Sequence, residues 1–277
     1  MFISATKKKF LEIMKIYIKK LYFFFRNFLK IKPLIYNFPI NKYASVSDAF
    51  YFRNDYIKTI FCLSNIASHI NPKIKQNDFV KIYIFSNKGE LLKILNFTLK
   101  PFETKKILFA ELNLKANYGS FYVFHNFNQN ELLIKNNSFV TERGYVGFSE
   151  NSIFWNFVHG NHNSAYLSKK NKIKSLMTKS IFINEYFPQL TFNDCDKFDL
   201  IFTNSENKKI NYRIQTYDLE NNIINDSNFK LNSFNTIKAS FTNNHKKIKF
   251  VKIFSKMYFP RPVIFKYYSK YFDVLHG

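Results

Sequence analysis

The sequence predicts an all-β protein made of two tandem antiparallel β-sandwich domains of jelly-roll or immunoglobulin-like type, related by internal duplication and preceded by an amphipathic helix. Three observations predict this. Residues 80–109 and 212–241 share one pattern of apolar and polar positions at a constant offset, without a gap. Aromatic residues make up 19% of the chain, which favours strands. Short apolar runs alternate with polar turns throughout.

Residues 1–43 are expected to form a basic amphipathic helix, over 7–32, followed by a linker. Charged residues recur there at spacings of three, four or seven, aromatic residues lie opposite them, and Pro33 ends the helix. The longest uncharged run, 21–25, is much shorter than the roughly 20 residues that cross a bilayer. Two alternatives remain: the helix binds an anionic membrane face, or it packs on the first β domain.

The first domain is predicted over 44–166 and the second over 180–277, with a lysine-rich linker at 167–179. Long helical patterns of the kind that connect parallel strands are missing, so antiparallel pairing is favoured. The strands expected in the first domain are 57–63, 79–85, 91–99, 105–109, 120–124, 145–148 and 154–158. Those expected in the second are 198–203, 211–217, 228–231, 237–241, 248–254, 263–267 and 271–275.

The formal charge of +23 is typical of nucleic-acid-binding proteins, because a polyanion rewards a dense basic surface. However, Lys accounts for 37 of the 42 basic residues and Arg for 5, beside abundant Asn, Ile, Phe and Tyr. This is the composition of an AT-rich coding sequence. A solvated lysine surface is therefore the preferred interpretation, and nucleic acid is not the favoured partner.

Two cysteines, Cys62 and Cys195, lie far apart in the sequence and form no CxxC or Cys/His motif. This pattern favours free thiols in a reducing compartment over a secreted disulfide framework. We expect a cytoplasmic protein, located at the inner membrane face if its first helix binds lipid.

A recurring pair of motifs marks the candidate site. Arg143 precedes His159-Gly160, and Arg261 precedes His276-Gly277 at almost the same spacing. The first of these segments also holds scarce residue types, including the only tryptophan. If the strands pair, a guanidinium and an imidazole meet beside an aromatic platform, as an anionic or hydroxyl-rich ligand requires. The predicted ligand-binding residues are Arg143, Tyr145, Trp155, His159, His162, Arg261 and His276.

A plainer interpretation is that these residues are structural, with the arginines pairing at a sheet corner and Trp155 filling the core. A metal shared by His159, His162 and Glu142 fits no standard zinc spacing, so no metal and no cofactor are predicted. Nucleophile-elbow, phosphate-loop, dinucleotide-binding and zinc-protease motifs are all missing from the sequence.

The sequence therefore favours a non-catalytic binding or accessory protein that recognises a glycan or another anionic polar ligand near Arg143 and His159. The predicted architecture resembles carbohydrate-binding and adhesion modules in outline only. One alternative is an enzyme acting on a cell-surface polysaccharide, with His159 as general acid or base and Arg143 orienting a negative group. The other is a nucleic-acid-binding protein.

Overall fold

The computed structural model is all-β from residue 45 onward. The residues that it describes are 14, 17, 18, 20–22, 24, 25, 45–125, 141–142, 144–168, 170–177, 179–243, 247–257 and 261–277. The chain divides into two compact units, Met1–Ile35 and Tyr36–Gly277, and all strands of the described residues belong to the larger one.

The first half of the larger unit forms two sheets. One has the order β11-β10-β1-β6-β3-β4, with β7 parallel to β1, and the other has the order β5-β2-β8-β9. Two short helices, α2 (Ile66–Ile70) and the 3-10 helix η1 (Phe109–Leu112), lie between strands. The strands are β1 (Val46–Arg53), β2 (Lys58–Ser64), β3 (Asp78–Ser86), β4 (Leu91–Leu99), β5 (Thr104–Leu108), β6 (Tyr118–His125), β7 (Thr141–Glu142), β8 (Tyr145–Ser149), β9 (Asn156–His159), β10 (Asn161–Leu167) and β11 (Ile173–Ser175).

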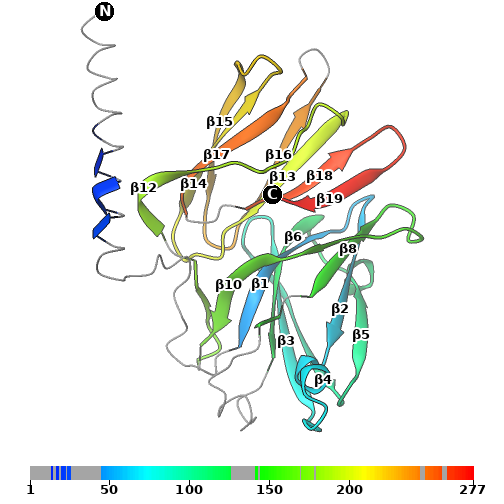
Figure 1. Ribbon diagram of the computed structural model, residues 1–277. Helices are drawn as coiled ribbons and strands as arrows, with labels where there is room; N and C mark the ends of the chain where they lie inside the picture. The colour runs from blue at the N-terminus through cyan, green and yellow to red at the C-terminus, as the bar shows by residue number, and fades with distance from the viewer. Residues whose placement is uncertain are drawn as a thin grey trace, which may run out of the picture. The chain divides into compact units, whose positions relative to one another are not determined.

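The second half forms two further sheets with matching strand orders, β12-β17-β14-β15 and β16-β13-β18-β19 (Figure 1). The first matches β1-β6-β3-β4, and the second matches β5-β2-β8-β9. The strands are β12 (Lys179–Tyr186), β13 (Lys197–Thr203), β14 (Ile210–Tyr217), β15 (Ile223–Leu231), β16 (Thr236–Thr242), β17 (Phe250–Met257), β18 (Val263–Tyr267) and β19 (Phe272–His276).

Two buried asparagines show how closely the halves correspond. The side-chain amide of Asn65 donates to the carbonyls of Leu99 and Lys100, at 3.4 and 3.1 Å. The amide of Asn204 donates to those of Leu231 and Asn232, at 3.2 and 2.8 Å. The two pairs of carbonyls are separated by the same offset that relates the repeated sequence patterns, so the repeat extends to hydrogen bonds in the structure. Each amide satisfies carbonyls that burial would otherwise leave unpaired.

The prediction of two tandem β-sandwich domains is nevertheless wrong. The chain from Tyr36 to Gly277 is one compact unit, and its four sheets have a propeller-like arrangement. The core is the physical reason, because a single buried cluster joins Phe50 and Phe148 of the first half to Val263 and Phe265 of the second. The second half also has a buried cluster of its own, which includes Phe198 and Ile253, but two separate domains would not share a buried cluster of this size. Here the second half completes the core of the first.

The junction between the halves also contains stacked rings and a buried polar chain. Phe234 stacks on Phe85, with ring centroids 4.6 Å apart and planes 8° from parallel. The buried Arg53 donates through Nη1 to the Tyr267 hydroxyl at 2.5 Å, and that hydroxyl donates to Asp199 Oδ2 at 2.7 Å. A buried arginine is tolerated only when its hydrogen bonds are made, so this chain links specific strands of the two halves.

The prediction of an amphipathic helix over residues 7–32 is corrected as well. Among the described residues, the helices that form complete elements are α2 and η1, and both are short. The described positions between Met14 and Phe25 are helical, but the apolar side chains of Tyr17, Leu21 and Phe24 are exposed. No helix in the described part of the chain is long and apolar enough to cross a membrane.

Candidate functional site

Strands β8 and β9 form an antiparallel hairpin that places two aromatic side chains on its outer side. Tyr145 pairs with His159, and Gly147 pairs with Phe157. Side chains point alternately to the two faces of a strand, and Val146, which follows Tyr145 in β8, is buried. Tyr145 and Phe157 therefore project outward, with exposed fractions of 52% and 50%. Exposed aromatic rings grouped on one face are a typical mark of a binding surface.

The outward rings have defined geometry. The rings of Tyr145 and His159 lie with centroids 3.9 Å apart and planes 36° from parallel. Phe157 lies over Gly147, where a Cβ atom would meet Phe157 Cε1 and Ile60 Cγ2 at 2.7 Å each. Only glycine lets the Phe157 ring lie this close to the backbone of β8. The rings of Tyr145, Phe157 and His159 therefore lie together on one side of the hairpin.

The neighbouring strands extend this surface. Cys62 on β2 pairs with Lys106 on β5, and by the register of β2 and β8 it is next to Tyr145. Lys106 is exposed, whereas Cys62 is partly exposed between the buried Phe61 and Leu63. We call the outward side of the sheet β5-β2-β8-β9 the open face; it is lined by Ile60, Cys62, Lys106, Tyr145, Phe157 and His159.

Trp155 lies at the end of the same hairpin, before β9 begins. Its Nε1 donates to the carbonyl of Ser152 at 3.2 Å, and its side chain is only partly exposed. The adjacent Ile153 and Phe154 are the strongly exposed residues of this loop. Trp155 therefore borders the open face at the hairpin tip.

Two of the predicted site residues cannot be located on this face. Arg143 lies outside the described residues, and so does the side chain of His162, although the backbone of β10 is described. The approach of Arg143 to His159 stays a prediction. The residues on either side of Arg143 are described, and they lead to a second cluster of polar groups.

The predicted residues of the second half, Arg261 and His276, lie at the junction. Arg261 Nε donates to the carbonyl of Gly277 at 2.8 Å. Burial and the nearby charge of Arg261 lower the pKa of His276 to about 4, although hydrogen bonds to the backbone of His159 and Gly160 act in the opposite direction. His276 is therefore neutral at pH 7. The His-Gly pairs of the two halves thus meet, with β9 against β19.

A buried triad that the sequence analysis missed lies beside the open face. His125 Nδ1 is 2.5 Å from Asp78 Oδ2, and His125 Nε2 is 2.7 Å from Glu142 Oε2. The three side chains are 0%, 1% and 3% exposed. Burial alone would lower the pKa of His125, but the hydrogen bonds to Asp78 and Glu142 outweigh it and raise the pKa to about 9. His125 is therefore an imidazolium that donates to both carboxylates at neutral pH.

The second half has no such triad at the equivalent positions. At the offset of the repeat, Asp78 and His125 correspond to Ile210 and Met257, and both of these are buried. Buried charges are often no more stabilising than apolar residues of similar volume. The second half forms the same strand order without these charged residues, so the strand order does not depend on them. The triad is a feature of the first half alone. A position-by-position comparison of the two halves could have revealed the triad, because the second half has apolar residues where the first has Asp78 and His125.

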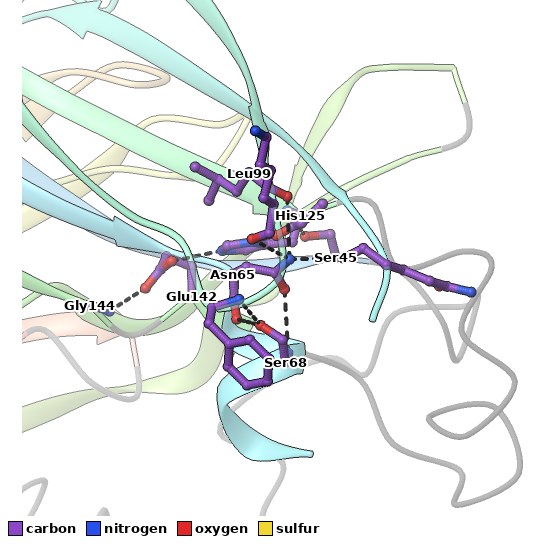
Figure 2. Close-up of polar contacts among 11 residues, drawn as sticks. Ser45, Asn65, Ser68, Leu99, His125, Glu142 and Gly144 are labelled. Atoms are coloured by element: carbon purple, nitrogen blue, oxygen red, sulfur yellow. Dashed lines mark hydrogen bonds and ion pairs between the residues drawn. The ribbon is translucent and has the colours of Figure 1, made fainter. Parts of the chain in front are cut away.

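The triad is connected to the open face through the backbone. Glu142 Oε1 accepts a hydrogen bond of 2.5 Å from the amide of Gly144, the residue before Tyr145. Figure 2 shows Glu142 directed toward His125 on one side and toward Gly144 on the other. Since both nitrogens of His125 face carboxylates, the triad is arranged for hydrogen bonding. In the described residues, no group of three His, Cys, Asp or Glu side chains is placed to hold a metal ion.

Comparison with known proteins adds no family. No family model and no curated protein matches the chain. Among solved structures, it is similar to a β-glucuronidase from glycoside hydrolase family 2, with 12% sequence identity and a TM-score of 0.17. The similarity covers 83% of this chain and 23% of that chain. A likeness this weak carries no argument about the fold or the activity.

Proposed function

We propose that the protein is a non-catalytic binding protein that recognises a glycan on the open face. The observation that supports this best is the pair of half-exposed rings, Tyr145 and Phe157, on one side of a sheet beside His159. A sugar ring has an apolar side formed by its C–H groups and a rim of hydroxyls. Exposed aromatic faces suit the first, and the Tyr145 hydroxyl, the imidazole and Lys106 suit the second.

The chemistry of the face favours a glycan that carries a carboxylate or another anionic group. Lys106 lies on the same side of the sheet as Tyr145, with Cys62 between them. A lysine ammonium binds an anion as a point charge, and an aromatic ring beside it supplies apolar contact.

The test is direct binding to an array of oligosaccharides built from glucose, galactose, N-acetylglucosamine and glucuronic acid, followed by calorimetry on the best-bound member. Tyr145→Ala and Phe157→Ala are expected to weaken binding at least tenfold, because each removes a stacking ring. Phe79→Ala is the matched control, since Phe79 is equally exposed but lies on β3 in another sheet.

Two results would contradict the proposal. One is the absence of binding to any glycan of the array. The other is equal weakening by the Phe79 variant, which would show that the open face is not the site. Retention on DNA that falls steeply with salt, without glycan binding, would instead favour the nucleic-acid alternative. The cytoplasmic location stays a prediction.

A further inference from the structure

We propose that the buried triad of Asp78, His125 and Glu142 is a positioning device for the open face, one that keeps the Tyr145 ring against His159. This inference rests on the proposed function, because it concerns how the same face is held ready for its ligand. The triad residues do not touch the ligand themselves. They act through the backbone at Gly144.

The first step of the argument is the connection between the strands. Asp78 begins β3, His125 ends β6 and Glu142 ends β7, so the triad joins three strands at one end of their sheet. The backbone of His125 is held in addition, because its amide donates to Ser45 Oγ at 2.7 Å. A hydrogen-bonded imidazolium between two carboxylates has little freedom to rotate. The orientation of the Glu142 carboxylate is therefore determined by His125.

The second step leads from Glu142 to the other sheet. With Oε2 held by His125, the remaining oxygen Oε1 points to the Gly144 amide. Gly144 has no space for a side chain, since a Cβ atom there would lie 2.8 Å from that oxygen and 3.0 Å from the Phe61 ring. The backbone just before Tyr145 is thus held between the carboxylate and a core ring. This determines where β8 starts and how the Tyr145 ring meets His159.

The third step separates positioning from stability. The second half has Ile210 and Met257 where the first has Asp78 and His125, and it forms its sheets with the same strand order. An apolar pair therefore suffices for this part of the fold. The face next to that pair is covered by the first half, so it has no exposed ring to position. The charged triad occurs where the adjoining face is open.

The experiment introduces the second half's Ile and Met at Asp78 and His125 and removes the remaining carboxylate, in a variant with Asp78→Ile, His125→Met and Glu142→Leu. Replacing a buried ionic triad by apolar residues commonly preserves folding. We expect a folded protein in which the His159 C2 proton loses the ring-current shift caused by Tyr145. We also expect the best-bound array oligosaccharide to bind about tenfold more weakly, as with other supporting residues. Assignment of the His159 signal comes from the His159→Gln variant.

A second pair of variants keeps the test decisive if the triple variant does not fold. Glu142→Gln keeps an oxygen for the Gly144 amide, whereas Glu142→Leu removes it. We expect Glu142→Gln to keep the His159 signal and to bind within about threefold of the wild type, and Glu142→Leu to change the signal and bind about tenfold more weakly.

An unchanged His159 signal and affinity in a folded triple variant would overturn the inference. Equal losses in the two Glu142 variants would do the same, because the acceptor oxygen would then be irrelevant. A wild type that binds no glycan would remove the proposed function, while the His159 signal would still decide whether the triad positions Tyr145.

Discussion

The open face and its counterpart in the second half have the same place in the strand order but opposite surroundings. Tyr145 pairs with His159 in the first half, and Val263 pairs with His276 in the second. Tyr145 is half exposed, whereas Val263 is 6% exposed. The second half uses this face to join the first half, and its side chains there, Val263, Phe265 and Val274, are buried. The first half leaves the rings of Tyr145 and Phe157 half exposed on the corresponding face.

The same contrast holds at the loop before β5 and β16. Phe102 and Phe234 both have left-handed backbones, with φ of 64° and 57°. Phe234 stacks on Phe85 of the first half, whereas Phe102 is exposed. Left-handed backbone is costly for an aromatic residue. The junction offsets that cost at Phe234, whereas Phe102 meets only the edge-on ring of His69 among the aromatic rings of the described residues.

The strongest change in stability should distinguish the centres of the two faces. Phe265 is fully buried at the junction, with its ring against Tyr51 and Phe148. Phe265→Ala should lower the free energy of unfolding by about 3–5 kcal/mol, because it leaves a cavity. Phe157→Ala, on the open face, should lower it by less than about 1 kcal/mol. Urea unfolding measures both, and equal losses would break the contrast between a joined and an open face.

A reciprocal exchange of turn residues should have a smaller effect. Gly89 and Asn221 occupy equivalent positions of the repeat and both have positive φ, of 80° and 67°. A Cβ atom at Gly89 would collide with the Ser233 carbonyl and lie 2.8 Å from Asn235 Oδ1. Gly89→Asn should therefore cost about 2 kcal/mol by separating the halves, whereas Asn221→Gly should change stability by less than about 1 kcal/mol. Thermal unfolding of both variants tests this, and a harmless Gly89→Asn would show that the junction is loosely packed.

The two histidines with shifted pKa values should give opposite pH dependences, with slopes of at most about 1.4 kcal/mol per pH unit. The pKa of His125 is raised to about 9, so its stabilising contribution is complete below pH 6.5 and is lost as the pH rises through 9. The pKa of His276 is lowered to about 4, so its contribution is complete above pH 6.5 and is lost as the pH falls toward 4.

Urea unfolding of His125→Met and His276→Gln variants between pH 4 and 9.5 measures the two contributions separately. The stability deficit of the first variant should shrink toward pH 9.5, and that of the second should shrink toward pH 4. Parallel curves for both variants and the wild type would contradict the assignment of His125 as a buried imidazolium and of His276 as a neutral ring.

Much of the secondary structure was predictable, because alternation and turn residues are local signals. The predicted strand 263–267 coincides with β18, and the predicted strand 79–85 lies within β3. The hairpin that joins Tyr145 to His159 also follows from such signals, as the polar run Ser149 to Ser152 marks a turn after the first strand. The triad was not predictable in this way, because Asp78, His125 and Glu142 come from separate strands and belong to no recognisable sequence motif.

The amino-acid sequence alone was enough to show that the chain is rich in strands, that its two halves share one pattern at a constant offset, and that scarce residues gather near His159. These properties depend only on neighbouring residues and on their spacing along the chain. Packing in three dimensions settled that residues of both halves share a buried cluster, that Val263 is covered while Tyr145 is half exposed, and that His125 is enclosed between two carboxylates. Each of these depends on which surfaces exclude water from one another, and that is a property of the packed chain rather than of any segment of it.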